Sequence, residues 1–128
     1  MIFRRTVYAA VGGLIAAGTL TATAPTASAA TGCDATTKSW TCSVSWGSSK
    51  GDFTGSGSST HAKGWVKDDD DDGDCVQIVI TWYGSGGKKD TDYSPQACPQ
   101  GNKDTFDKMP GDSTHWSPSA VKIAIQKV

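Results

Sequence analysis

Glutamate is absent from the sequence, and arginine occurs only as Arg4 and Arg5 near the N-terminus. Without glutamate, one of the side chains that serve as general acids and bases is missing. Beyond the first 29 residues, ten lysines stand against thirteen aspartates, which gives a net charge of about −3. Because nucleic-acid binding favours a basic face with arginine forks, this balance argues against a nucleic-acid partner.

Good helix formers are also scarce, whereas glycine, serine, threonine and aspartate abound. This composition favours strands and turns over helices, so we predict an all-β protein.

The first 29 residues have the pattern of a secretory signal peptide. Arg4 and Arg5 form a basic start, an apolar stretch follows over Val7–Leu20, and Ala27-Ser28-Ala29 offers a small-residue cleavage site. The apolar stretch is shorter than the ~20 residues of a transmembrane helix. We therefore predict cleavage before Ala30, a secreted protein with no membrane association after cleavage, and one domain over 30–128.

Four cysteines lie in this domain, namely Cys33, Cys42, Cys75 and Cys98. An even number in an exported chain indicates two disulfides, and four cysteines allow three pairings. We favour Cys33–Cys42 and Cys75–Cys98, which join neighbours along the chain. A zinc site is disfavoured because the sequence contains no Cys-x-x-Cys pair.

Cys75–Tyr83 is the strongest strand candidate, because Val76, Ile78, Ile80 and Trp82 alternate onto one apolar face. Shorter alternating segments, separated by glycine-, proline- and aspartate-rich turns, predict the other strands. These segments are Trp40–Trp46, His61–Lys67, Asp90–Tyr93, Thr105–Met109 and Ala120–Val128. The pattern predicts a small antiparallel β-sandwich with two disulfides.

Two connections carry specific expectations. Gly47–Ser59 is nearly all small and polar apart from Phe53, so we expect a long loop or a weak edge hairpin there. The acidic run Asp68–Asp74 joins the strand at His61–Lys67 to the strand at Cys75–Tyr83, and we expect these two strands to form a hairpin.

The segment Cys33–Cys42 is the first candidate site. If its ends are bridged, it presents Thr37, Lys38 and Ser39 on a short constrained arch. Trypsin-like clefts bind such an arch in extended form with a lysine or arginine in the specificity pocket, and constraint lowers the ordering cost of binding. The Thr-Lys-Ser core resembles the reactive loop of Bowman–Birk-type inhibitors, although their proline pair is missing. The alternative is a structural staple with a surface lysine. The partner-binding residues predicted from this loop are Thr37, Lys38, Ser39 and Trp40.

The acidic run is the second candidate. Asp68, Asp70, Asp72 and Gly73 match the first half of an EF-hand calcium loop. The twelfth position, where a bidentate glutamate belongs, is Val79. We predict no cofactor, with weak calcium binding at Asp68, Asp70 and Asp72 as an alternative to a solvated turn that discourages edge pairing.

Catalytic patterns are poor. Gly47–Gly51 satisfies the letters of the G-x-S-x-G nucleophile motif, but a glycine- and serine-rich segment follows where that motif needs a helix. Nothing in the spacing places His61 or His115 beside a nucleophile. We predict no enzymatic activity and no catalytic residues.

Five tryptophans are many for a chain of this length. Core packing is the default for Trp65 and Trp116, and the alternative is an exposed carbohydrate or protein platform.

The signal-peptide style, the polar composition and the two-disulfide β pattern resemble small exported proteins of actinobacteria such as Streptomyces. Together with the Lys38 loop, they are similar to the small bridging subunits of umbrella-type toxin particles. That resemblance implies a non-catalytic adaptor that joins a toxin stalk to a lectin subunit with a trypsin-like fold.

These observations predict a secreted, non-enzymatic protein-binding module whose partners are other secreted proteins, with Lys38 as the central contact. It would act as an adaptor or structural subunit of an extracellular, toxin-type assembly. The alternatives are a trypsin-like serine protease inhibitor and a calcium- or carbohydrate-binding surface module.

Overall fold

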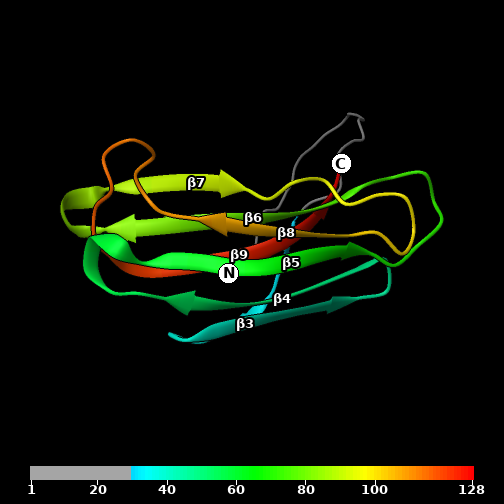
Figure 1. The fold of residues 1–128 in the computed structure, drawn as a ribbon, viewed down its shortest axis with the longest axis horizontal. Coiled ribbons are helices and arrows are strands. Elements are labelled where there is room, and N and C mark those ends of the chain that lie inside the picture. The colour runs from blue at the N-terminus through cyan, green and yellow to red at the C-terminus, as the bar shows by residue number, and fades with distance from the viewer. Residues whose placement is uncertain (1–29) are drawn as a thin grey trace, which may run out of the picture.

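Residues 30–128, which the computed structural model describes, form a small antiparallel β-sandwich of two sheets (Figure 1). The first sheet has the strand order β1 (Thr31–Gly32), β9 (Pro118–Lys127), β6 (Val76–Gly84) and β7 (Lys89–Tyr93). The second has the order β2 (Asp34–Ala35), β3 (Ser39–Val44), β4 (Gly47–Thr54), β5 (His61–Asp68) and β8 (Lys103–Lys108). Two short 3-10 turns, η1 (Gly57–Ser59) and η2 (Ser85–Gly87), lie in the loops. The predicted all-β sandwich is confirmed.

Strand β6 supplies the centre of the core. It lies between β9 and β7, and its predicted apolar face is completely buried. Ile123 and Ile125 of β9 and Trp40, Ala62, Val66 and Phe106 of the opposite sheet pack against this face. The alternation of apolar residues along β6 therefore identified the core correctly.

Strand β4 corrects the expectation of a long loop or a weak edge hairpin at Gly47–Ser59. Gly47–Thr54 is an interior strand of the second sheet, hydrogen-bonded to β3 on one side and β5 on the other. Its small residues make room for Trp40, because a Cβ at Gly51 would lie 2.1 Å from the Trp40 Cη2 atom. Gly64 of β5, which pairs with Gly51, makes room for the same indole ring, since its Cβ would lie 2.7 Å from the Trp40 Cζ2 atom. Glycines that suggested a loop thus serve close packing.

The acidic run corrects a second expectation. β5 and β6 do not form a hairpin, because β5 pairs with β4 and β8, whereas β6 pairs with β7 and β9. Asp69–Cys75 instead carries the chain from one sheet to the other. A connection of this length easily spans the ~10 Å between packed sheets, so alternation within the two strands did not specify which strands pair.

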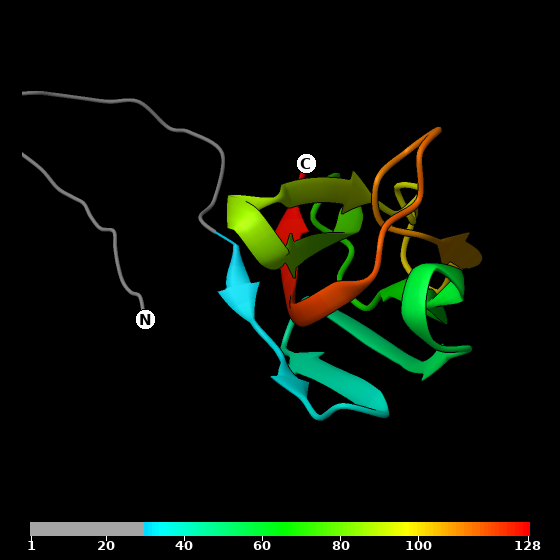
Figure 2. The same ribbon diagram turned by 90° about the vertical axis from the view of Figure 1, so that its left-hand side faces the viewer.

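Both predicted disulfides are present, Cys33–Cys42 and Cys75–Cys98. The first lies where the chain leaves β1 in one sheet and enters β2 in the other, a crossing that closes one side of the sandwich (Figure 2). The second ties the residue before β6 to the loop that precedes β8.

Two disulfides fit an extracellular protein. Within residues 30–128, no helix is long and apolar enough to cross a membrane. The predicted signal peptide, residues 1–29, lies outside the described part of the chain.

Candidate functional site

The Cys33–Cys42 segment forms a tight hairpin rather than an open arch. β2 pairs with β3 through Asp34 with Thr41 and Ala35 with Trp40, directly inside the disulfide. The turn is closed by a hydrogen bond of 2.8 Å from the Thr36 amide to the Ser39 carbonyl. This hairpin is therefore fixed at its base by a covalent bond and at its tip by backbone pairing.

The Thr36 side chain strengthens the tip. Its Oγ1 atom accepts hydrogen bonds from the backbone amides of Lys38 and Ser39, each 3.1 Å long. The Lys38 carbonyl accepts a bond of 2.8 Å from the amide of Phe53, which ties the tip to the end of β4. These bonds hold the backbone on both sides of the Lys38 side chain.

Lys38 itself is exposed, and none of the ion pairs within residues 30–128 includes it. Thr37 is also exposed, whereas Ser39 is half-buried. The tip therefore presents one unpaired positive charge on a backbone that is already ordered.

Trp40 requires a correction. It was expected to contact a partner, but it is 2% exposed and fills the core between Phe53 and Phe106. Its Nε1 atom donates a hydrogen bond of 3.0 Å to the Ser49 Oγ atom. Because the alternation of Trp40–Trp46 already places Trp40 on the same face as Cys42, the inward orientation was visible in the sequence.

A cavity of about 520 Å³ lies beside the tip, and the sequence did not predict it. One wall is Ala35–Thr37 and the other is the first part of β9, with Phe53 and Trp82 among the apolar lining. β1 pairs only with Ile125 and Ala124 of β9, so it does not cover this first part. Because the tip forms one wall, a partner that encloses the tip would also cover this cavity.

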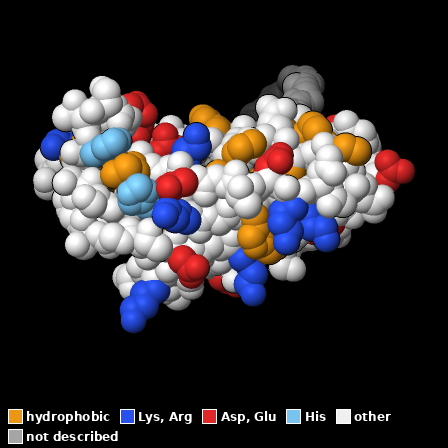
Figure 3. All heavy atoms as spheres, viewed as in Figure 1, with side chains coloured by type: hydrophobic (Ala, Val, Ile, Leu, Met, Phe, Trp, Pro, Cys, Tyr) orange, Lys and Arg blue, Asp and Glu red, His pale blue; other side chains and the backbone are white. Residues whose placement is uncertain are grey.

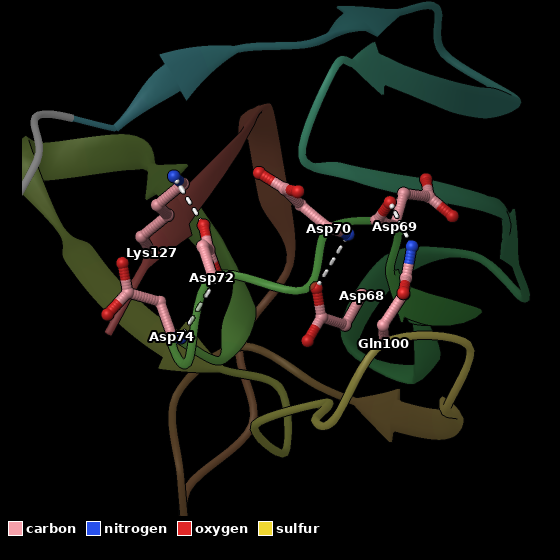
Figure 4. Close-up of polar contacts among 7 residues, drawn as sticks. All are labelled: Asp68, Asp69, Asp70, Asp72, Asp74, Gln100 and Lys127. Carbon is pink, nitrogen blue, oxygen red and sulfur yellow. Dashed lines mark hydrogen bonds and ion pairs between the residues drawn. The ribbon is translucent and has the colours of Figure 1, made fainter.

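The acidic run does not gather the three expected calcium ligands. Asp72 forms an ion pair with Lys127, with 2.6 Å between Oδ2 and Nζ (Figure 4). The hydrogen bond from the Lys127 ammonium group lowers the pKa of Asp72 below its ordinary value. Asp68 is 1% exposed, and its Oδ1 atom accepts a bond from the Asp70 amide. Figure 4 shows Asp72 directed toward Lys127 and away from Asp68 and Asp70, so the three carboxylates do not converge.

A different carboxylate cluster was missed. Asp90 and Asp92 of β7 and Asp112 of the loop before β9 place one oxygen each within 4.8 Å of one another. Burial raises the pKa of Asp92, and the negative charges of Asp90 and Asp112 add to this effect, against a hydrogen bond from Trp82. No spacing in the sequence signals this cluster, because it depends on two distant segments meeting. Exposed acidic groups of this kind are common without an ion.

The serine motif is not a nucleophile elbow. Ser49 lies within strand β4, is completely buried, and donates its hydroxyl to the Trp65 carbonyl at 2.6 Å. His61 contacts Asp107 at 2.7 Å on the far side of the sheet from the core, and His115 is exposed in a loop. Neither histidine forms a hydrogen bond with Ser49, whose bonds are to Trp40 and Trp65.

Comparison with known proteins adds no family. Neither family models nor curated proteins nor solved structures match this chain. Its function must therefore be inferred from the geometry of its own residues.

Proposed function

We propose that this protein is a secreted, non-enzymatic protein-binding module. In this proposal it serves as an adaptor or structural subunit of an extracellular, toxin-type assembly. It inserts the Lys38 tip into a cleft of a partner with a trypsin-like fold, as the resemblance to bridging subunits of umbrella-type toxin particles implies.

One observation carries the proposal: an exposed lysine without an ion pair among residues 30–128 stands on a hairpin whose base and tip are both held in place. Flexible surface lysines lose rotamer and backbone freedom when they are captured. Here the backbone freedom is already lost before binding, so the ordering cost is lower. A carboxylate at the base of a partner's pocket would supply the missing counter-charge.

The shape of the tip favours an adaptor over a protease inhibitor. A trypsin-like enzyme binds its substrate loop in extended form, whereas Thr36–Ser39 is a closed turn with the Thr36 amide bonded to Ser39. A partner that only encloses the lysine does not need the extended conformation.

The test is affinity capture with the mature protein, residues 30–128, from the native culture medium. We expect one or more larger exported chains to be retained, and the Lys38→Ala variant to lose them. Lys89→Ala, which removes an exposed lysine of β7 on the other sheet, is the matched control and should retain them.

Incubation with active trypsin separates the two versions of the proposal. An adaptor leaves turnover unchanged, whereas an inhibitor suppresses it at near-stoichiometric ratio. Equal capture by Lys38→Ala and the unmodified protein would contradict any role of the tip.

A further inference from the structure

The outer face of the second sheet gathers lysine side chains from β4, β5 and β8. In one row of directly paired residues, Lys50 lies next to Trp65. In the adjacent row, Lys67 lies next to Lys103. We call these four residues the lysine face. Figure 3 shows lysine side chains around an apolar side chain over β5 and β8. The two rows also contain four hydroxyl residues, Thr41, Ser43, Ser48 and Thr105, and one carboxylate, Asp34 of β2, which pairs with Thr41.

The charges of the lysine face are poorly neutralised. Lys67 and Lys103 are directly opposite on neighbouring antiparallel strands, an arrangement of like charges that is unfavourable by itself. Lys67 has one counter-charge, Asp69, at 3.5 Å. Lys50 and Lys103 belong to none of the ion pairs within residues 30–128. An anionic ligand would relieve this repulsion, although the chain as a whole is acidic.

Trp65 gives the lysine face a second property. It is half-buried, and the Lys103 ammonium group lies 4.3 Å from the centroid of its ring. Beside it, a hollow of about 400 Å³ extends across β4 toward Ser39 and Thr41, with Lys50 and Lys63 among its lining. An aromatic ring, hydroxyl groups, two ammonium groups and the single carboxylate of Asp52 thus surround one open depression.

This combination fits an acidic sugar better than other anions. Carbohydrates pack a ring face on an aromatic side chain and exchange hydrogen bonds with hydroxyl groups. Nucleic acids are bound by basic grooves with several stacking aromatics, and protein interfaces need a desolvated apolar centre. Among the outward residues of β3, β4, β5 and β8, Trp65 is the one large aromatic, and no aliphatic side chain accompanies it.

We propose that the lysine face binds an acidic polysaccharide, with uronate carboxylates at Lys50, Lys67 and Lys103 and a sugar ring against Trp65. The Lys38 side chain lies in the β2–β3 turn outside both rows, although the hollow reaches Ser39 at the end of that turn. The module would then hold a protein partner and an anionic glycan at the same time.

The test is titration calorimetry of the mature protein with polygalacturonate at low salt, with dextran as the neutral control polymer. Binding should weaken steeply with added salt, because three lysines release counterions. The double variant Lys50→Ala/Lys103→Ala should lose at least about tenfold in affinity, and the magnitude of its salt slope should fall by about two. Lys88→Ala/Lys89→Ala removes the same charge at the start of β7 and in the turn before it, and this variant should bind as the unmodified protein does.

Trp65→Phe keeps a ring and should retain part of the affinity, whereas Trp65→Ala should lose most of it, with melting curves to confirm that each variant is folded. No heat with polygalacturonate at low salt would overturn the proposal. So would equal binding by Lys50→Ala/Lys103→Ala. Equal affinity for polyglutamate or single-stranded DNA would also overturn it, because the face would then be an unspecific cation surface. Capture of the protein partner by Lys38→Ala is a separate measurement, so either proposal can fail alone.

Discussion

Removal of the Cys33–Cys42 disulfide tests whether the tip works because it is rigid. The double substitution Cys33→Ser/Cys42→Ser opens a covalent loop with a sequence separation of nine residues. The chain-entropy model assigns about 2.6 kcal/mol to closing such a loop. For a domain of about 100 residues, that loss lowers the melting midpoint by roughly 10–20 °C.

The sandwich should survive this loss at low temperature. The second disulfide remains, and Trp40 still anchors β3 in the core. Only two residue pairs then hold β2 to β3, so the base of the hairpin frays and the Lys38 backbone gains freedom. We therefore expect folded protein with faster amide hydrogen exchange at residues 36–39 and weaker capture of the protein partner.

Cys75→Ser/Cys98→Ser is the matched control for this experiment. Its loop is longer, with a sequence separation of 23, so the same model assigns it about 3.4 kcal/mol, which is more than the first disulfide. It leaves the Lys38 hairpin intact. At a temperature where both variants are folded, Cys75→Ser/Cys98→Ser should therefore be the more destabilised variant and yet lose less capture of the partner than Cys33→Ser/Cys42→Ser. Undiminished capture by Cys33→Ser/Cys42→Ser would refute the claim that rigidity of the tip supports binding.

Three further predictions concern the fold and its carboxylates. Folding raises the pKa of Asp92, so its contribution to stability is present in acid and is lost as the pH rises through that pKa. Asp92→Asn keeps an acceptor for the Trp82 indole. The variant should be more stable than the unmodified protein by on the order of 0.5 kcal/mol at pH 7, because solvent screens the charges, and should show no such gain in acid. Equal urea midpoints of the two proteins at pH 7 would contradict this. Gly51→Ala should destabilise by about 1–3 kcal/mol in urea, because its Cβ would overlap the Trp40 ring, and an unchanged midpoint would show that the ring moves freely. We expect millimolar calcium chloride to leave the melting midpoint unchanged, since Asp72 forms an ion pair with Lys127. A rise of several degrees would support the calcium alternative. If Asp90→Asn abolished that rise, the ion would be placed at the cluster of Asp90, Asp92 and Asp112.

The parts of the fold that the sequence predicted are those that depend on local alternation. The buried face of β6 can be identified from the alternation of side chains within that one strand. The two disulfides join cysteines that are neighbours in the chain. β4 was not predicted as an interior strand, because the role of its glycine depends on a residue of another strand: Gly51 is small so that the Trp40 ring of β3 can pack against it. Nothing within Gly47–Thr54 distinguishes a glycine that serves packing from one that serves a turn.

The candidate sites divide in the same way. Lys38 at a constrained tip followed from the cysteine spacing alone. The alternation of Trp40–Trp46 also indicated that Trp40 points into the core and is not a contact residue of the tip, provided that Trp40 is assigned to the strand and not to the loop. The lysine face could not be predicted, because Lys50, Lys67 and Lys103 become neighbours only through the pairing of β4, β5 and β8.

The distribution of charge indicates how the two proposed sites relate. The lysine face and the Lys38 tip belong to the same sheet, whereas the acidic loop Asp69–Cys75 leaves that sheet at the end of β5. Asp72 and Asp69 are held by Lys127 and Lys67, so this loop neutralises part of its own charge. A partner that approached through the lysine face would compete with the glycan, and one that approached only through the tip would not. Capture of the protein partner should therefore persist in saturating polygalacturonate, and mutual exclusion of the two ligands would place them on one surface.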